Sequence, residues 1–136
     1  MSVPVSDRQE GELKVFTQAR ALTVRSLRIC SNEKHFPKRL RWAYSSKICE
    51  KANEMYALIL QANSVFVESE NDARLRITYW KQSLACAVAM EGLIDLATEL
   101  TTMSLDKVRS WESEVKEVQS LIRNRIKSDK RRFCNG

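Results

Sequence analysis

The feature that most constrains the fold is a row of apolar residues that follows Pro37. Its members recur every three or four positions, which places them on one side of a helix. The row consists of Tyr44, Ile48, Ala52, Met55, Ile59, Ala62 and Phe66. Pro37 suits the first turn of such a helix, where a missing backbone N–H has no cost. The spacing therefore predicts a helix over residues 37–65.

Two other segments show the same spacing, and a further helix is expected between them, over residues 70–102. Ser69 and Asp72 resemble an N-terminal cap for the third segment, and Ser104 can cap the fourth. The predicted helices cover residues 7–32, 37–65, 70–102 and 105–130. The buried row of the first helix contains Val15, Ala19, Leu22, Ser26, Ile29 and Cys30, and that of the fourth contains Val108, Trp111, Val115, Val118 and Ile122.

The scarcity of turn residues and the short connections favour an all-α fold. The 136 residues include only three Gly and two Pro. We expect one domain over residues 1–136, folded as an antiparallel four-helix bundle with a frayed basic tail over 130–136. The segment SLACAVAMEGLIDLA, in the third helix, is apolar or small around most of its circumference. Such a helix is central in a bundle or is covered by another subunit, and we expect self-association.

Positive charge is concentrated in two stretches of the chain. The formal net charge is +6; residues 34–47 hold five Lys or Arg and no acid, and residues 121–136 hold six against Asp129 alone. This local excess favours a polyanionic partner over a role in solubility.

Two helices each carry a row of basic residues that contains no acid, and such rows indicate phosphate binding. The candidate nucleic-acid-binding residues are Arg109, Lys116, Arg123, Lys127 and Lys130 on the fourth helix, Arg131 and Arg132 after it, and Lys14, Arg25 and Arg28 on the first. Lys38, Arg39 and Arg41 are secondary candidates, because cations in the first turn of a helix gain nothing from its dipole. The alternative is a solvated charged face.

The three tryptophans have different expected roles. Trp111 lies on the buried row of the fourth helix. Trp80 lies near Arg74 and Arg76, and these three residues are the candidate partner-binding surface. For Trp42, stacking on bases and packing against a neighbouring helix both remain open.

Catalytic and metal-binding signals are weak. His35, which we expect to be an exposed loop residue, is the only histidine, so no pair of histidines can hold a metal, and no Gly-rich phosphate loop is present. The carboxylates of Glu91, Asp95 and Glu99 line one side of the third helix, where we expect them to be solvated or ion-paired. We expect no enzymatic activity, no cofactor and no metal.

The remaining expectations concern the cysteines and the location of the chain. No CxxC pair is present, and Cys30, Cys49 and Cys86 are expected to be small core residues. No signal-peptide segment and no apolar run of about 20 residues is found, so we expect a cytoplasmic protein and no membrane contact.

The run KVFTQARALTVRSLRICSNEKHFPKRLRWAYSSKICEKANEMYALILQAN resembles a family of small four-helix-bundle proteins. The family includes the accessory variability proteins of diversity-generating retroelements and the proteins encoded in intervening sequences of bacterial ribosomal RNA. The likeness rests on K-V-x-x-x-A-x-x-L, on F-P-K after a short loop and on the helix that follows, and it covers roughly residues 12–126. Many accessory proteins end their last helix with Gly-Trp, whereas this chain reads IRNRIK.

The resemblance implies a non-enzymatic protein that assembles as a homopentameric barrel of four-helix bundles. In the accessory group such a protein binds the reverse transcriptase and its template RNA and supports mutagenic cDNA synthesis, while the polymerase carries the catalytic residues. The alternative is an oligomeric protein-interaction scaffold of the intervening-sequence type, with no direct role in RNA binding.

Overall fold

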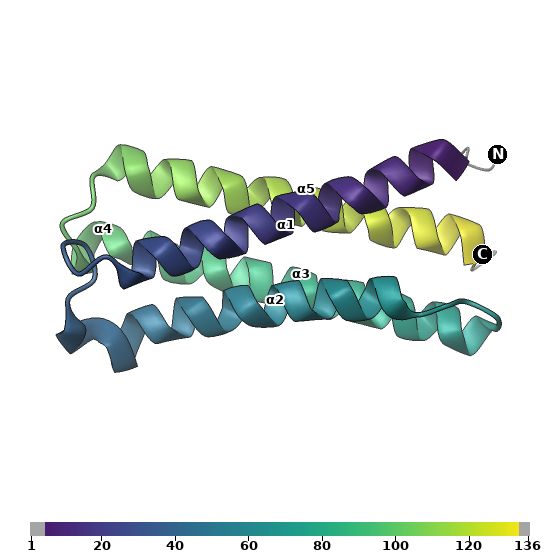
Figure 1. Ribbon diagram of the computed structural model, residues 1–136, viewed down its shortest axis with the longest axis horizontal. Coiled ribbons are helices and arrows are strands. Elements are labelled where there is room, and N and C mark those ends of the chain that lie inside the picture. The colour runs from purple at the N-terminus through teal and green to yellow at the C-terminus, as the bar shows by residue number, and fades with distance from the viewer. Residues whose placement is uncertain (1–4, 134–136) are drawn as a thin grey trace.

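A computed structural model describes residues 5–133, with side chains from residue 10 onward, and shows four long helices lying side by side (Figure 1). The helices are α1 (Val5–Ser31), α2 (Ser46–Ser64), α3 (Glu70–Asp95) and α5 (Leu105–Phe133). The segments that precede α2 and α5 lie at one end of the bundle, and the α2–α3 loop and both termini lie at the other. No strand occurs within residues 5–133. The all-α prediction is confirmed.

The start of the second predicted helix is less regular than expected. A 3₁₀ turn over Lys38–Leu40 and a π-helical turn over Arg41–Ser45 precede α2. Pro37 is extended, with φ −63° and ψ 154°, and lies just before these turns rather than inside a helix. The chain turns at the predicted place but needs two irregular turns before a regular α-helix forms.

The third and fourth predicted helices also differ from the structure at their ends. A break at Leu96 separates α3 from a single turn, α4 (Ala97–Leu100). The α5 helix continues to Phe133, so residues 130–133 are helical and are not a frayed tail; the rest of the predicted tail, residues 134–136, lies outside the described residues. Both predicted caps form: the Ser69 hydroxyl accepts from the Asp72 N–H at 3.2 Å, and the Ser104 hydroxyl accepts from the Lys107 N–H at 3.2 Å.

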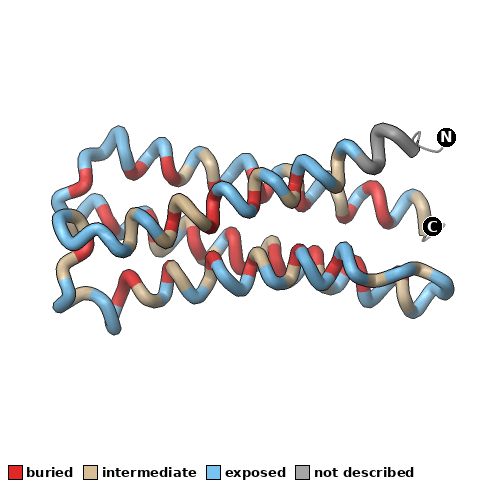
Figure 2. Tube along the Cα trace, viewed as in Figure 1, coloured by how far each residue is buried: buried red, intermediate tan, exposed pale blue. Residues whose placement is uncertain are grey.

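The core is made by the rows of residues that face the bundle interior, coloured red in Figure 2. The six α2-side residues from Tyr44 to Ala62 are buried as predicted, and so is the complete α5 row from Val108 to Ile122. In α1 the row is buried from Val15 to Ser26, whereas Ile29 is only half-buried. Phe66 was wrongly placed in the core: it is 80% exposed, because α2 ends at Ser64 and helical spacing no longer applies beyond it.

The wide apolar arc of α3 is buried on one side only. Trp80, Met90 and Ile94 are fully buried in the bundle. On the opposite side, Val88 is 50% exposed and Leu96 is 45% exposed. Apolar surface of this kind on a single chain is typical of a helix that contacts another protein surface.

Candidate nucleic-acid interface

The outer face of α5 carries the basic row predicted from the sequence. Arg109, Lys116, Arg123, Lys127 and Lys130 are all exposed, on the side of the helix away from the core. Arg123, Lys127 and Lys130 have no hydrogen-bond or ion-pair partner among residues 10–133. Because nothing within the described protein neutralises them, these three side chains are available to an external anion.

One basic residue of the row, Lys116, lies close to an acidic residue. The Lys116 ammonium lies 3.8 Å from a Glu91 carboxylate oxygen across the α3–α5 boundary. Burial and the nearby Asp95 carboxylate raise the pKa of Glu112 on the same flank. Of the two alternatives expected for the carboxylates of the third helix, solvation or ion pairing, Glu91 shows ion pairing with a neighbouring helix.

The row on α1 is divided between exposed and paired residues. Lys14 and Arg28 are exposed, whereas Arg25 donates to a Glu114 carboxylate oxygen at 2.6 Å and to the Ser110 hydroxyl at 3.2 Å. The Arg25 guanidinium therefore links α1 to α5, and it is less available to a ligand than its neighbours.

The irregular turns before α2 present a basic corner with an exposed aromatic ring. Lys38, Arg39 and Arg41 are exposed, and Lys38 lies 3.8 Å from Glu33. Trp42 is 83% exposed, so it packs against no other helix of the described chain. Basic side chains beside an exposed aromatic ring are the two components of surfaces that bind single-stranded nucleic acids. A π-helical turn is rare in regular helices and is frequent at functional sites.

A basic pocket lies between the end of α1 and the start of α5. It has a volume of about 380 Å³, and its polar lining includes Arg25, Arg28, Lys107 and His35. His35 is half-buried, not the exposed loop residue that we expected, and its Nδ1 atom is buried with no hydrogen-bond partner among the described residues. Sequence reasoning missed Lys107 and His35, because the pocket forms only where the ends of two helices meet.

The predicted partner-binding surface around Trp80 is wrong for two of its three residues. Trp80 is fully buried, and the side chain of Arg76 is 8% exposed. Only Arg74 is exposed, where it pairs with Glu70 at 2.8 Å. Because Arg76 and Trp80 fall on the inner side of α3, they contact the bundle interior and not a partner.

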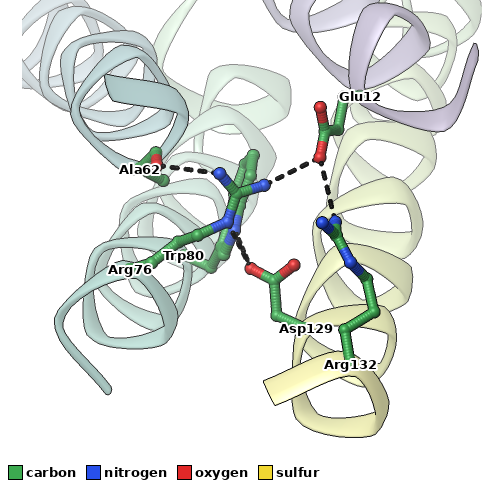
Figure 3. Close-up of polar contacts among 6 residues, drawn as sticks. All are labelled: Glu12, Ala62, Arg76, Trp80, Asp129 and Arg132. Carbon is green, nitrogen blue, oxygen red and sulfur yellow. Dashed lines mark hydrogen bonds and ion pairs between the residues drawn. The ribbon is translucent and has the colours of Figure 1, made fainter. Parts of the chain in front are cut away.

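Figure 3 shows what holds the buried Arg76 guanidinium. Its Nε donates to an Asp129 carboxylate oxygen at 2.7 Å, and one terminal nitrogen donates to Glu12 at 2.9 Å. The other terminal nitrogen lies 3.4 Å from the Ala62 carbonyl oxygen. The Trp80 indole N–H donates to the same oxygen of Asp129 at 2.9 Å. This buried cluster joins α1, α3 and α5 and is structural.

Two basic residues of α5 lie around this cluster rather than on the outer face. Arg132, predicted to bind nucleic acid, lies 3.5 Å from Glu12 and is a quarter exposed, so it is partly engaged inside the protein. Burial lowers the pKa of Arg125, whose guanidinium lies against Gly11 of α1. A Cβ atom at Gly11 would lie 2.4 Å from an Arg125 nitrogen, so glycine permits this close approach. By contrast, Arg131 is exposed.

No family model, curated protein or solved structure matches the chain. Within residues 5–133, none of the helices is long and apolar enough to span a membrane. The same residues hold no group of three or more His, Cys, Asp or Glu side chains that could bind a metal ion.

Proposed function

We propose that this protein binds RNA without catalysing a reaction, as an accessory protein of a diversity-generating retroelement. The observation that supports RNA binding best is the outer row of α5, where Arg123, Lys127 and Lys130 are exposed and have no internal partner in the described chain. Phosphate groups of a nucleic-acid backbone neutralise such a row without reading its sequence.

The retroelement role rests on the family resemblance of residues 12–126. In that role the protein binds the reverse transcriptase and its template RNA while the polymerase performs the chemistry. The gene neighbourhood tests this part separately. We expect an adjacent reverse-transcriptase gene with a pair of near-identical repeats, whereas a gene lying alone within ribosomal RNA would contradict it.

The assembly that we propose is a homopentamer of antiparallel four-helix bundles. The loop positions in Figure 1 support the antiparallel order. The exposed apolar residues Val88 on α3, Leu96 at the break and Leu100 on α4 support self-association, because such side chains are usually covered by another protein surface. Native mass spectrometry should show a species of five chains, and a monomer at micromolar concentration would contradict the pentamer.

A filter-binding assay with a structured RNA over a salt series tests the binding itself. Replacing Arg123, Lys127 and Lys130 by Glu removes three cations from the row. We expect at least about tenfold weaker binding at 0.1 M salt, and a slope of log K against log salt that is smaller by about 2 to 3.

The matched control replaces Arg20, Lys51 and Lys81 by Glu, since these residues lie on other surfaces. Arg20 and Lys81 are exposed, and Lys51 is partly exposed and pairs with Glu54 at 3.3 Å. Both variants have the same formal net charge, so a general charge effect would weaken them equally. If the two variants bind equally, or if the wild type shows no saturable binding near physiological salt, the α5 row is only a solvated face.

The second candidate function is an oligomeric protein-interaction scaffold with no RNA role. The ion pairs of Arg25 with Glu114 and of Lys116 with Glu91 favour it, because basic residues of both rows already meet acids of this chain. A pentamer that fails to bind RNA in the filter assay would support the scaffold.

A further inference from the structure

Two of the cysteines form a pair in a surface pocket that RNA binding does not explain. Cys30 is the penultimate residue of α1, and Cys49 lies in the first turn of α2. Both are half-buried rather than core residues, unlike Cys86, which is buried. Each cysteine acts on the pKa of the other. Both line an open pocket of about 360 Å³, so a small molecule can reach the pair.

The surroundings of the pair favour a thiolate on Cys49 and a thiol on Cys30. Interaction with the Cys30 side chain lowers the pKa of Cys49 to about 7, although burial and Glu50 act in the opposite direction. The same interaction and burial raise the pKa of Cys30. The end of α1 acts in the same sense, because Cys30 lies at the negative end of this helix, where a thiolate is disfavoured.

Two charged residues, Arg41 from the π-helical turn and Glu50 from α2, line the pocket that holds the cysteines. Tyr44, whose pKa is raised mainly by burial and further by Cys30, stays a neutral phenol at neutral pH. Among the residues that line the pocket, Arg41 provides the cation that can stabilise a departing anion.

We propose that Cys49 and Cys30 form a two-cysteine oxidation site that reacts with hydrogen peroxide. In the first step the Cys49 thiolate attacks one peroxide oxygen, the O–O bond breaks, and hydroxide leaves and takes up a proton. In the second step Cys30 attacks the Cys49 sulfenic acid and forms the S–S bond. The second hydroxide leaves with the Cys30 proton as water. Two thiols and one peroxide thus give one disulfide and two waters.

The disulfide joins the end of α1 to the start of α2 and closes the loop that holds the basic corner. That loop contains Lys38, Arg39 and Trp42, which lie between the two cysteines in the chain. Oxidation therefore restricts a segment that carries exposed cations and an exposed aromatic ring. In a reducing compartment such disulfides are transient and respond to oxidants.

Peptide mapping of the wild-type protein after peroxide treatment tests the proposal. Trypsin releases residues 29–34 with Cys30 and residues 48–51 with Cys49, so the disulfide appears as one linked peptide that reduction separates. We expect this link at near-stoichiometric peroxide in the native protein, with Cys86 still reduced. A native protein in which the two peptides never link, or in which Cys86 is oxidised first, would overturn the proposal.

Two single variants identify the order of the steps. In Cys30→Ser the sulfenic acid on Cys49 has no resolving thiol, and dimedone should label Cys49. In Cys49→Ser, Cys30 should remain a thiol under the same treatment. Equal dimedone labelling of Cys30 in that variant would overturn the assignment of Cys49 as the nucleophile. Circular dichroism of both variants establishes that the helices are intact.

The pH dependence of alkylation gives a readout that a structural role would not affect. Iodoacetamide should react with Cys49 at least about tenfold faster than with Cys86 at pH 7, since the thiolate is the reactive form. The Cys49 rate should rise through about pH 7 and level off above pH 8, whereas the Cys86 rate should keep rising, because burial raises the pKa of Cys86. Superimposable profiles for the two cysteines would contradict the proposal.

Discussion

The inner and outer faces of α5 use charge in opposite ways. On the inner face, Asp129 is fully buried and holds the Arg76 guanidinium at 2.7 Å. On the outer face, Lys127 and Lys130 lie two residues before and one residue after it and are exposed. Charged residues that are neighbours in the chain thus differ in availability, because the rotation of the helix decides which of them meets protein and which meets solvent. A count of charges in a stretch of sequence does not distinguish the two.

The largest effect is expected at the inner face, from Asp129→Asn. The change leaves Arg76 buried beside a neutral amide, and removal of one partner from a buried ion pair typically costs about 3 to 5 kcal/mol. We expect a loss near the lower value, since Glu12 still accepts from Arg76. Urea unfolding followed by circular dichroism at pH 7 measures it.

The control for this variant is Asp106→Asn, in the exposed first turn of α5. It removes the same charge from the same helix and should cost less than about 1 kcal/mol. Equal losses for the two variants would mean that burial does not distinguish the inner face from the outer one.

Replacing both inner charges should be less harmful than replacing one. The double variant Arg76→Met with Asp129→Leu leaves no uncompensated charge, and we expect it to be more stable than Asp129→Leu alone by about 1 to 3 kcal/mol. It should remain below the wild type, since the Trp80 indole N–H loses its acceptor. The same urea titrations measure this, and a double variant less stable than Asp129→Leu would contradict the account.

Helical spacing predicted the helices and most of the core, because this pattern depends only on residues that are a few positions apart in the chain. The apolar rows of α2 and α5 are buried at the predicted positions from Tyr44 to Ala62 and from Val108 to Ile122. The prediction failed where a helix ends, as at Phe66, since spacing carries no information beyond the last turn. The irregular turns before α2 were also missed, because sequence spacing does not distinguish α from π turns.

The sequence predicted the exposed residues of the candidate site but not the burial of Arg76. Arg123, Lys127 and Lys130 follow from the phase of one helix, which a sequence shows. The burial of Arg76 depends on Asp129 and Glu12, which are remote in the chain and meet it only in the folded bundle. One local signal existed: Arg76 shares its side of α3 with Ala73, Ile77 and Trp80, all buried.

An intermediate effect is expected for the pair of Arg25 and Glu114, which is neither fully buried nor free. Their side chains are 36% and 20% exposed and 2.6 Å apart. A double-mutant cycle with Arg25→Ala and Glu114→Ala should give a coupling of about 0.5 to 1 kcal/mol. The coupling should decrease in 1 M NaCl, whereas the loss in Asp129→Asn should change little, because buried pairs are poorly screened. A coupling that is unaffected by salt would mean that this pair is as poorly screened as the buried pair on the inner face.

The smallest effect on stability is expected at the outer face, from replacing Arg123, Lys127 and Lys130 together by Ala. These side chains have no internal partner in the described chain, and Ala is the best helix former, so no favourable contact is lost and helix propensity does not fall. The free energy of unfolding should therefore change by less than about 0.5 kcal/mol, and relief of the repulsion among the cations acts in the stabilising direction. RNA binding by the same variant should weaken as it does for the Glu variant, although less, because Ala adds no repulsion toward phosphate. A stability loss above about 1 kcal/mol would show that the outer row is structural, and the contrast between the two faces of α5 would then be one of degree.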